Sequence, residues 1–399
     1  MITRLSQMIT NLEAIVPTIK IHRRSVAALA AVLAGAASLS ACGSSSESSS
    51  GSGPDISTLS QEGQARLELL YEGSGTSPAT EAPKPEAGKD VWFIASGMSL
   101  ELIAASAQGF EDAAEAVGWN AKVVDGKFQP SLWLTGIEQA IAARADGIVL
   151  YALDCAAVRN GLEAAKKARI PVVGVESEDC DPSLETVLTY ADGDFPEFAR
   201  QLGADQALWA AASANGKGTI IELRETDAAI TLYQSDGVAA TLEEECPDCK
   251  HVTVEFTAPE IGPALQQKVE QAILKNPDAI GMLVPYDDLL VAGVSSAIVS
   301  SGRGGQIKVI SVGGTTAAFD LMRQNRGLNA DIVFDPRWEG FAAVDWMNRL
   351  LHGETPTGES APTGIGQQLV EQEDVPKEGK VAATVDYEAI YLESWGVDG

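Results

Sequence analysis

Residues 140–154 read Ala-Ile-Ala-Ala-Arg-Ala-Asp-Gly-Ile-Val-Leu-Tyr-Ala-Leu-Asp, and they set the architecture of the chain. A helical pattern ends here, the apolar run Gly147–Tyr151 follows, and an acidic loop closes the unit. An unbroken apolar strand after a helix is typical of a parallel sheet that helices cover on both faces. The same order of residues returns in Ala272-Ile273, Asp278-Ala279-Ile280 and Tyr286-Asp287. This repeat predicts two lobes of similar structure.

Outward from this unit, short apolar strands alternate with amphipathic helices, one of which places Trp133, Ile137 and Ile141 on one face. Right-handed crossovers put the strand-to-helix loops along one edge of each sheet. We therefore predict an α/β fold with two Rossmann-like lobes built on parallel sheets. The predicted strands are Val91–Ala95, Ala121–Val124, Gly147–Tyr151, Pro171–Val175, Gly218–Leu223, Val252–Phe256, Ile280–Val284 and Ile307–Val312.

Composition narrows the function before any motif is considered. The chain has 399 residues, of which 45% are hydrophobic, enough for more than one core. Its 28 Lys and Arg against 56 Asp and Glu give a net charge of −28. Such a surface repels phosphate backbones, so we expect no nucleic-acid partner. Only three histidines are present, which disfavours His-based catalysis and zinc sites.

The N-terminal region carries an export pattern. Arg23 and Arg24 precede an Ala- and Leu-rich run that ends in Leu39-Ser-Ala-Cys-Gly43, which resembles a bacterial lipobox. The resemblance implies a signal peptide over residues 1–41, lipidation of Cys42 and a location on the extracytoplasmic face of the cell membrane. A plain transmembrane anchor is the alternative. Residues 42–88, rich in Ser, Gly and Pro, are expected to form a lipid-anchored flexible tether with a short helix at Thr58–Tyr71.

From residue 88 to residue 395 the chain resembles the type I periplasmic binding proteins of sugar ABC transporters, the ribose-binding-protein-like group. The segments that carry the resemblance are Ala145–Asp154, Ile170–Val175, Gly216–Ile221, Asn276–Ile280, Tyr286-Asp287-Asp288, Ile307–Val312 and Asp335-Pro336. Lac-repressor-type regulators share this fold, but here a lipobox stands where their DNA-binding headpiece would be.

The resemblance implies two lobes joined by a three-stranded hinge, with the ligand in the cleft between them. The crossings are expected near Asp192, near Gly313 and after His352. The N-terminal lobe would then take residues 88–192 and 314–355, and the C-terminal lobe residues 193–313 and 356–395. The sequence departs from the sugar-binding pattern at several cleft positions, which leaves the identity of the ligand open. Of that pattern, only the acidic pair Asp287-Asp288 survives clearly.

Residues at the predicted strand ends are the candidate ligand contacts. Carboxylates accept paired hydrogen bonds from neighbouring hydroxyls, and flat aromatic faces cover the C–H face of a sugar ring. Trp338 could equally be packing, and Arg337 could instead pair with Asp335 and stabilise the hinge. Asp287→Ala is expected to weaken binding without changing stability. The predicted ligand-binding residues are Ser96, Asp154, Glu176, Thr226, Tyr286, Asp287, Arg337 and Trp338.

The cysteines beyond Cys42 are expected to form disulfides, because export permits them. Cys155 and Cys180 follow consecutive strands, so a bridge between them is predicted. Cys246-Pro-Asp-Cys249 is a CxxC that favours a small structural loop disulfide over a redox or metal site. No metal and no cofactor are predicted.

No nucleophile elbow, phosphate-cradling loop, zinc-protease motif or dinucleotide fingerprint is found in the sequence, so we expect no enzyme. The predicted function is that of a monomeric substrate-binding lipoprotein of an ABC importer. It would capture a small sugar-like solute and deliver it to an ABC permease and its ATPase. The alternative is a ligand-sensing lipoprotein that presents its closed form to a membrane receptor or kinase.

Overall fold

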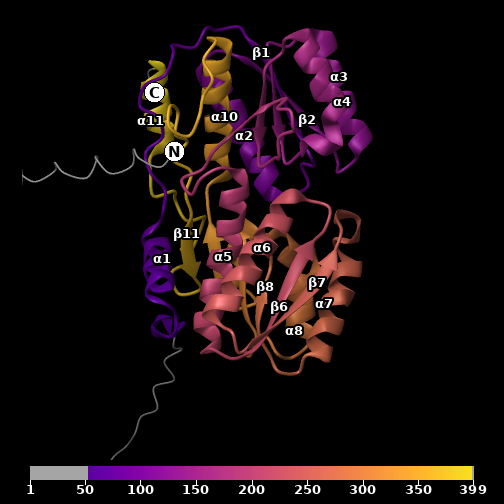
Figure 1. The fold of residues 1–399 in the computed structure, drawn as a ribbon, viewed down its shortest axis with the longest axis vertical. Helices are drawn as coiled ribbons and strands as arrows, with labels where there is room; N and C mark the ends of the chain where they lie inside the picture. The colour runs from indigo at the N-terminus through magenta and orange to yellow at the C-terminus, as the bar shows by residue number, and fades with distance from the viewer. Residues whose placement is uncertain (1–52, 398–399) are drawn as a thin grey trace, which may run out of the picture. The chain divides into compact units, whose positions relative to one another are not determined.

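The structure, a computed structural model, describes residues 53–397. The predicted signal peptide and the predicted lipidation site Cys42 lie outside the described residues. The described residues form one compact unit. Within it the chain builds two α/β lobes, drawn one above the other in Figure 1, with all the strands of the first lobe in the upper one.

The first lobe is built on a parallel sheet with the strand order β2-β1-β3-β4-β5. Its apolar core fills both faces of the sheet, and α10 packs against α2 on one of them. The strands are β1 (Asp90–Ala95), β2 (Asn120–Asp125), β3 (Gly147–Tyr151), β4 (Val172–Val175) and β5 (Thr186–Val187). The helices are α2 (Glu101–Ala116), α3 (Pro130–Ala143), α4 (Cys155–Ala168), α10 (Pro336–Leu351) and α11 (Tyr387–Trp395).

The second lobe has the order β11-β10-β9-β8-β6-β7, in which only β11 is antiparallel. The strands are β6 (Gly218–Glu225), β7 (Cys249–Phe256), β8 (Ala279–Leu283), β9 (Lys308–Gly313), β10 (Ala330–Val333) and β11 (Gln368–Glu371). The helices are α1 (Gln61–Glu72), α5 (Phe195–Ala214), α6 (Ala229–Glu245), α7 (Pro263–Lys275), α8 (Ser295–Ser300) and α9 (Thr316–Arg323). Short helical turns cover Ile56–Thr58, Ala258–Glu260 and Leu290–Val294.

The two sheets repeat one strand order, which confirms the predicted duplication. In each lobe the first strand, β1 or β6, lies between the second strand and the third. The repeated sequence unit occupies equivalent places, since it leads from α3 into β3 and from α7 into β8. Every predicted strand is present, with bounds that differ by three residues or fewer.

The division of the chain between the lobes differs from the predicted one after Gly313. Residues 314–333 belong to the second lobe, because α9 buries Phe319 and Met322 in its core and β10 pairs with β9. The chain therefore crosses at Phe334 and Asp335 rather than at Gly313. The four-residue strand β10 contains Asp331, so its apolar pattern does not stand out. After β11 the chain returns to the first lobe, where α11 packs on α10.

Residues 59–88 are not the free tether that their composition indicates. Helix α1 starts at its N-cap Ser60 and buries Leu67 and Leu70, and it lies beside β11 (Figure 1). After α1, Ser74 N–H donates to the Gln367 carbonyl at 2.8 Å, and further backbone bonds continue to Ala79. The apolar face of this helix has partners far away in the sequence, which a composition argument cannot detect.

Both predicted cysteine pairs are joined in the structure. Cys155 at the start of α4 is bonded to Cys180, with Cα atoms 5.3 Å apart, and Cys246 is bonded to Cys249. None of the described helices is long and apolar enough to cross a membrane.

Candidate ligand cleft between the lobes

The carboxyl edges of the two sheets carry the residues that lie between the lobes. Asp154 follows β3, and its Oδ2 accepts the N–H of Ala229 at the start of α6 in the other lobe, at 3.2 Å. Nearby, the Tyr233 hydroxyl of α6 donates to Glu178 Oε1 at 2.6 Å. These bonds join the two lobes directly, so the described conformation is a closed one.

A second set of interlobe bonds centres on Glu101 at the start of α2. Its backbone N–H donates to Asp288 Oδ1 at 3.1 Å, and its Oε1 accepts the N–H of Thr316 at 2.9 Å. Lys380 also forms an ion pair with Glu101, at 2.8 Å. The Glu101 carboxylate thus binds two segments of chain, at Thr316 and Lys380, while its backbone N–H binds Asp288.

In the first lobe, Tyr151, Tyr190, Glu176 and Glu339 form what we call the first-lobe cluster. Glu339 is buried on α10 and accepts hydrogen bonds from the hydroxyls of Tyr151 at 2.8 Å and Tyr190 at 3.2 Å. The Tyr190 hydroxyl also accepts the N–H of Glu176, at 3.2 Å. Burial raises the pKa of Glu176 to about 7, and burial together with the charge of Glu176 raises the pKa of Glu339. Glu176, the residue after β4, thus lies beside two phenols and a second carboxyl.

In the second lobe, Glu225, Tyr286 and Asp288 form the second-lobe cluster. The Tyr286 hydroxyl donates to Glu225 Oε2 at 2.7 Å, which joins the ends of β8 and β6. Burial raises the pKa of Glu225 to about 7 and also raises the pKa of Asp288. Thr226, the predicted contact next to Glu225, is exposed, and its hydroxyl donates to the Phe256 carbonyl at 3.2 Å.

Asp287 has a different role from the predicted ligand contact. Its carboxylate is fully buried, and Oδ2 accepts the N–H groups of Gly314 and Thr315 at 3.0 and 2.8 Å and the hydroxyl of Thr315 at 2.9 Å. It lies against Gly313, where a Cβ would stand 2.6 Å from Oδ1. Asp287 therefore fixes the turn after β9, and the expectation that its removal leaves stability unchanged is not supported.

Arg337 and Trp338 lie on the hinge side of the first lobe rather than with Asp154 and Glu176. The Arg337 guanidinium pairs with Asp112 at 2.8 Å and with Glu388 at 3.0 Å, not with the carboxylate of Asp335. Trp338 is buried and stacks on Tyr387 of α11 with a ring separation of 4.7 Å. Both side chains are engaged in attaching α11 to the lobe, so a packing role accounts for them.

Ser96 lies at the end of β1, as predicted, and aromatic residues from further along the chain cover it. Its carbonyl accepts the Phe128 N–H at 2.7 Å and the Trp133 indole N–H at 2.9 Å, while its hydroxyl has no partner among the described residues. The Phe128 ring lies against Gly97, where a Cβ would stand 2.3 Å from the ring. Aromatic residues after β2 thus cover the end of β1, a contact that local sequence does not indicate.

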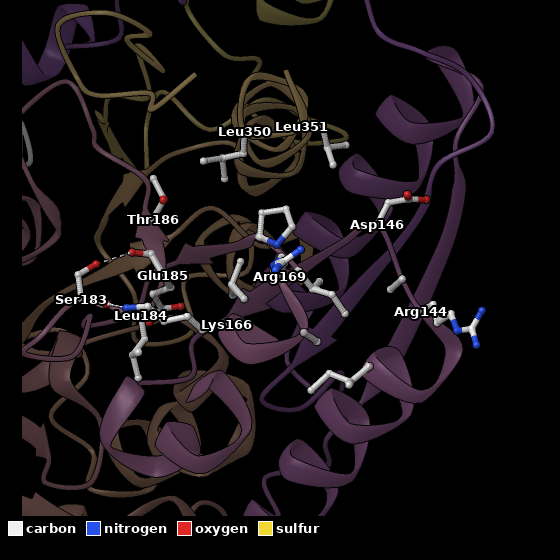
Figure 2. A pocket seen from close by; sticks show the side chains of 16 residues that line it. Arg144, Asp146, Lys166, Arg169, Ser183, Leu184, Glu185, Thr186, Leu350 and Leu351 are labelled. Atoms are coloured by element: carbon white, nitrogen blue, oxygen red, sulfur yellow. Dashed lines mark hydrogen bonds between the residues drawn. The ribbon is translucent and has the colours of Figure 1, made fainter. Parts of the chain in front are cut away.

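A hollow of about 860 Å³ lies elsewhere on the first lobe and is not this cleft. Figure 2 shows it beside Arg144 and Arg169, the residues that end α3 and α4, with Leu350 and Leu351 from the end of α10. Arg144 precedes β3 and Arg169 precedes β4, so the hollow lies at the amino edge of the first sheet. Ligands of open α/β sheets bind at the carboxyl edge.

Among the described residues, no group of three or more His, Cys, Asp or Glu side chains gathers as metal ligands would. The acidic side chains of the cleft are instead distributed between the two clusters.

The sequence matches a family described as the periplasmic binding protein domain over residues 91–355. No curated protein matches the chain in sequence. Several solved structures share its fold. A sugar-binding protein of a sugar ABC transporter from Bacillus halodurans is 21% identical, with a TM-score of 0.61, over 72% of this chain and 99% of that one.

Two further structures show the same likeness. A periplasmic solute-binding protein of an ABC transporter from Actinobacillus succinogenes, with bound D-allose, is 18% identical, with a TM-score of 0.63, over 72% of this chain and 99% of that one. A galactofuranose-binding protein is 20% identical, with a TM-score of 0.59, over 77% of this chain and 99% of that one. At these identities the comparison establishes the two-lobed fold.

Proposed function

This chain belongs to the periplasmic binding protein domain family, and from that premise we propose that it is the extracytoplasmic substrate-binding lipoprotein of an ABC importer for a small sugar-like solute. The observation that carries the proposal is the pair of polar clusters at the facing edges of the sheets. Each combines tyrosine with carboxylates, and direct interlobe bonds lie beside them. A solute held between the clusters contacts both lobes at once.

The clusters suit a polyhydroxylated ligand. Glu176 and Glu225 can each accept hydrogen bonds from hydroxyls, and Tyr286 can provide a ring face for the C–H groups of a sugar. Contacts to both lobes favour the closed form only when the solute is present, which is how such a trap signals that it is loaded. The permease and its ATPase would be separate chains. The role needs no catalytic group, so we expect the protein to bind its solute and release it unchanged.

A thermal-shift screen of the exported protein tests this proposal. The compounds are sugars, polyols, nucleosides and amino acids, and the expected result is stabilisation by a hydroxylated solute. Glu176→Gln should remove most of the shift, whereas Glu163→Gln, exposed on α4, should leave it unchanged. Stabilisation by apolar compounds only, or none by any hydroxylated solute, would contradict the proposal. Uptake of the solute by cells that lack the chain separates transport from sensing, because a sensor is not needed for uptake itself.

Lipid anchoring at Cys42 is the second part of the proposal. Each acyl chain contributes about 0.8 kcal/mol per buried CH₂, so two or more chains hold a protein firmly to a membrane. Cys42→Ser should give protein without lipid label, either uncleaved or released from the membrane. Lipid labelling that persists in this variant would contradict the assignment.

A further inference from the structure

The cleft presents carboxylates from both lobes that form no ion pair among the described residues, and we propose that its solute carries a positive charge, as a hydroxylated amine such as an amino sugar does. The inference rests on the proposed function and narrows the class of solute for that same cleft.

The distribution of charge is the first argument. Glu176 and Asp154 belong to the first lobe, and Glu225 and Asp288 to the second. None of the ion pairs among the described residues includes any of these four. An uncompensated carboxylate is expensive to bury, so a closed cleft of this composition favours an occupant that brings the missing charge.

The basic side chains near the cleft are engaged with other groups or face solvent. Lys380 is paired with Glu101 at 2.8 Å and acts on Asp288 only from that position. Arg200 lies over the ring of Tyr233, 4.7 Å from its centroid. Lys127, after the edge-lying strand β2, is exposed. The negative charge of the four cleft carboxylates is therefore left for a bound ligand to balance.

Buried polar atoms without partners are the second, independent argument. Glu225 is only 6% exposed, and its Oε2 accepts the hydroxyl of Tyr286. The hydroxyl of Ser96, a residue 4% exposed at the end of β1, has no partner within the described part of the chain, and neither has Oδ2 of Asp288. These acceptors lie at the carboxyl edges of the sheets, where a ligand's N–H and O–H groups can reach them.

The aromatic groups fit the same class of ligand. Tyr286 presents a ring beside Glu225, and a cation gains from an aromatic face as well as from a carboxylate. Burial without a counter-charge raises the pKa of both Glu176 and Glu225 to about 7. An ammonium ligand would lower both values again, because an opposite charge favours the ionised carboxyl. A neutral sugar offers hydrogen bonds but no such compensation.

Titration calorimetry of the exported protein near pH 7 with matched compounds tests the inference. D-glucosamine and D-galactosamine are each compared with the parent hexose and with the N-acetyl derivative, which keeps the shape but removes the charge. We expect at least one amine to bind about tenfold or more tightly than both of its neutral partners. Glu225→Gln should reduce that preference several-fold while changing neutral-sugar affinity little, and Glu163→Gln should leave it intact.

Each outcome decides one claim. If a neutral sugar binds as tightly as its amine, the charge inference is overturned and the proposed function stands. If none of the six compounds binds, the charge inference is overturned, and the broad solute screen then decides the proposed function. Glu176→Gln provides a second variant from the other lobe should Glu225→Gln fail to fold, and thermal unfolding of both variants checks that they do.

Discussion

At the residue scale, Asp287 and Asp331 form a pair of buried carboxyls that the fold requires. Both accept the N–H of Gly314, at 3.0 and 2.9 Å, and each has one oxygen that finds no partner in the part of the chain that the structure describes. Burial raises the pKa of Asp287 from 3.8 to about 7, and the proximity of Asp287 raises the pKa of Asp331 as well. Like charges this close cannot both ionise at low cost, so the pair retains a proton in the folded state.

The sign of the resulting pH dependence follows from linkage. A carboxyl whose pKa is higher in the folded state binds more protons there, so stability falls as the pH rises from about 4 through about 7. Glu176, Glu225 and Glu339 contribute with the same sign. In the Asp331→Asn variant, the decrease in unfolding free energy between pH 5 and pH 8 should therefore be smaller than in the wild type by about 1–3 kcal/mol. Urea unfolding of wild type and variant at pH 5 and pH 8 measures this difference. An unchanged pH dependence of the unfolding free energy would contradict the paired titration.

The two disulfides should differ in how much they stabilise the fold. Cys155 and Cys180 are 25 positions apart and tie the start of α4 to the loop after β4, whereas Cys246 and Cys249 close a loop of only 3 positions. By loop-closure entropy the first bridge is worth about 3 kcal/mol and the second clearly less. Replacing each pair by alanine and unfolding in urea compares them. Denatured exported protein should show no free thiol, and a bridge from Cys155 to Cys246 would refute the pairing.

At the element scale, α1 belongs to the second lobe and should behave as part of its core. Leu67 and Leu70 are fully buried, while Leu69 on the same helix is 43% exposed. Leu67→Ala and Leu70→Ala should each cost about 2–5 kcal/mol of unfolding free energy, and Leu69→Ala much less. Denaturant unfolding of the three variants makes the comparison on one helix. Equal effects at all three positions would mean that α1 does not dock as described.

The elements that sequence predicts well are those whose pattern is local. The strands from β1 to β9, except the two-residue β5, are recognisable because their apolar residues are consecutive or alternate, and turns or helices bound them. Strand β10 escapes notice because Asp331 interrupts it, and that charge is tolerated only through Gly314 and Asp287, which come from other parts of the chain. Helix α1 agrees with the helix predicted at Thr58–Tyr71, but its docking, like strand β11, depends on partners some 300 positions away, as the bond between Tyr71 and Glu371 shows.

The candidate site was predictable to the same extent. Asp154, Glu176 and Tyr286 follow strands whose ends are evident, and the structure places each of them beyond the carboxyl end of its strand. Glu225 was missed because β6 runs two residues longer than its apolar pattern. Glu339 and Tyr190 reach Glu176 from α10 and from the loop after β5, and only tertiary contacts bring them there.

At the scale of the whole molecule, closure depends on bonds that exist only when the lobes meet. Glu101 is the centre of one such set, with Thr316, Asp288 and Lys380. Glu101→Gln removes the ion pair and should weaken solute affinity about 3- to 10-fold by destabilising the closed form, with little effect on unfolding. Calorimetry measures the affinity, and small-angle scattering measures the contraction on binding. Glu111→Gln, exposed on α2, is the control, and equal affinities for the two variants would argue against a closing role.

The docking of α1 also sets how far the protein can travel from a membrane. Asp55 already donates its N–H to the Ala212 carbonyl at the end of α5, and Arg66 forms ion pairs with Asp192 and Asp205. If Cys42 is the anchor, the linker between the membrane and the folded protein is the thirteen residues to Asp55, which span at most roughly 45 Å when fully extended. Had the chain been free up to residue 88, the reach would be roughly 160 Å. This linker also joins the second lobe, so the second lobe would stay near the membrane while the first lobe moves relative to it. The permease would then have to bind the protein within this short distance of the membrane.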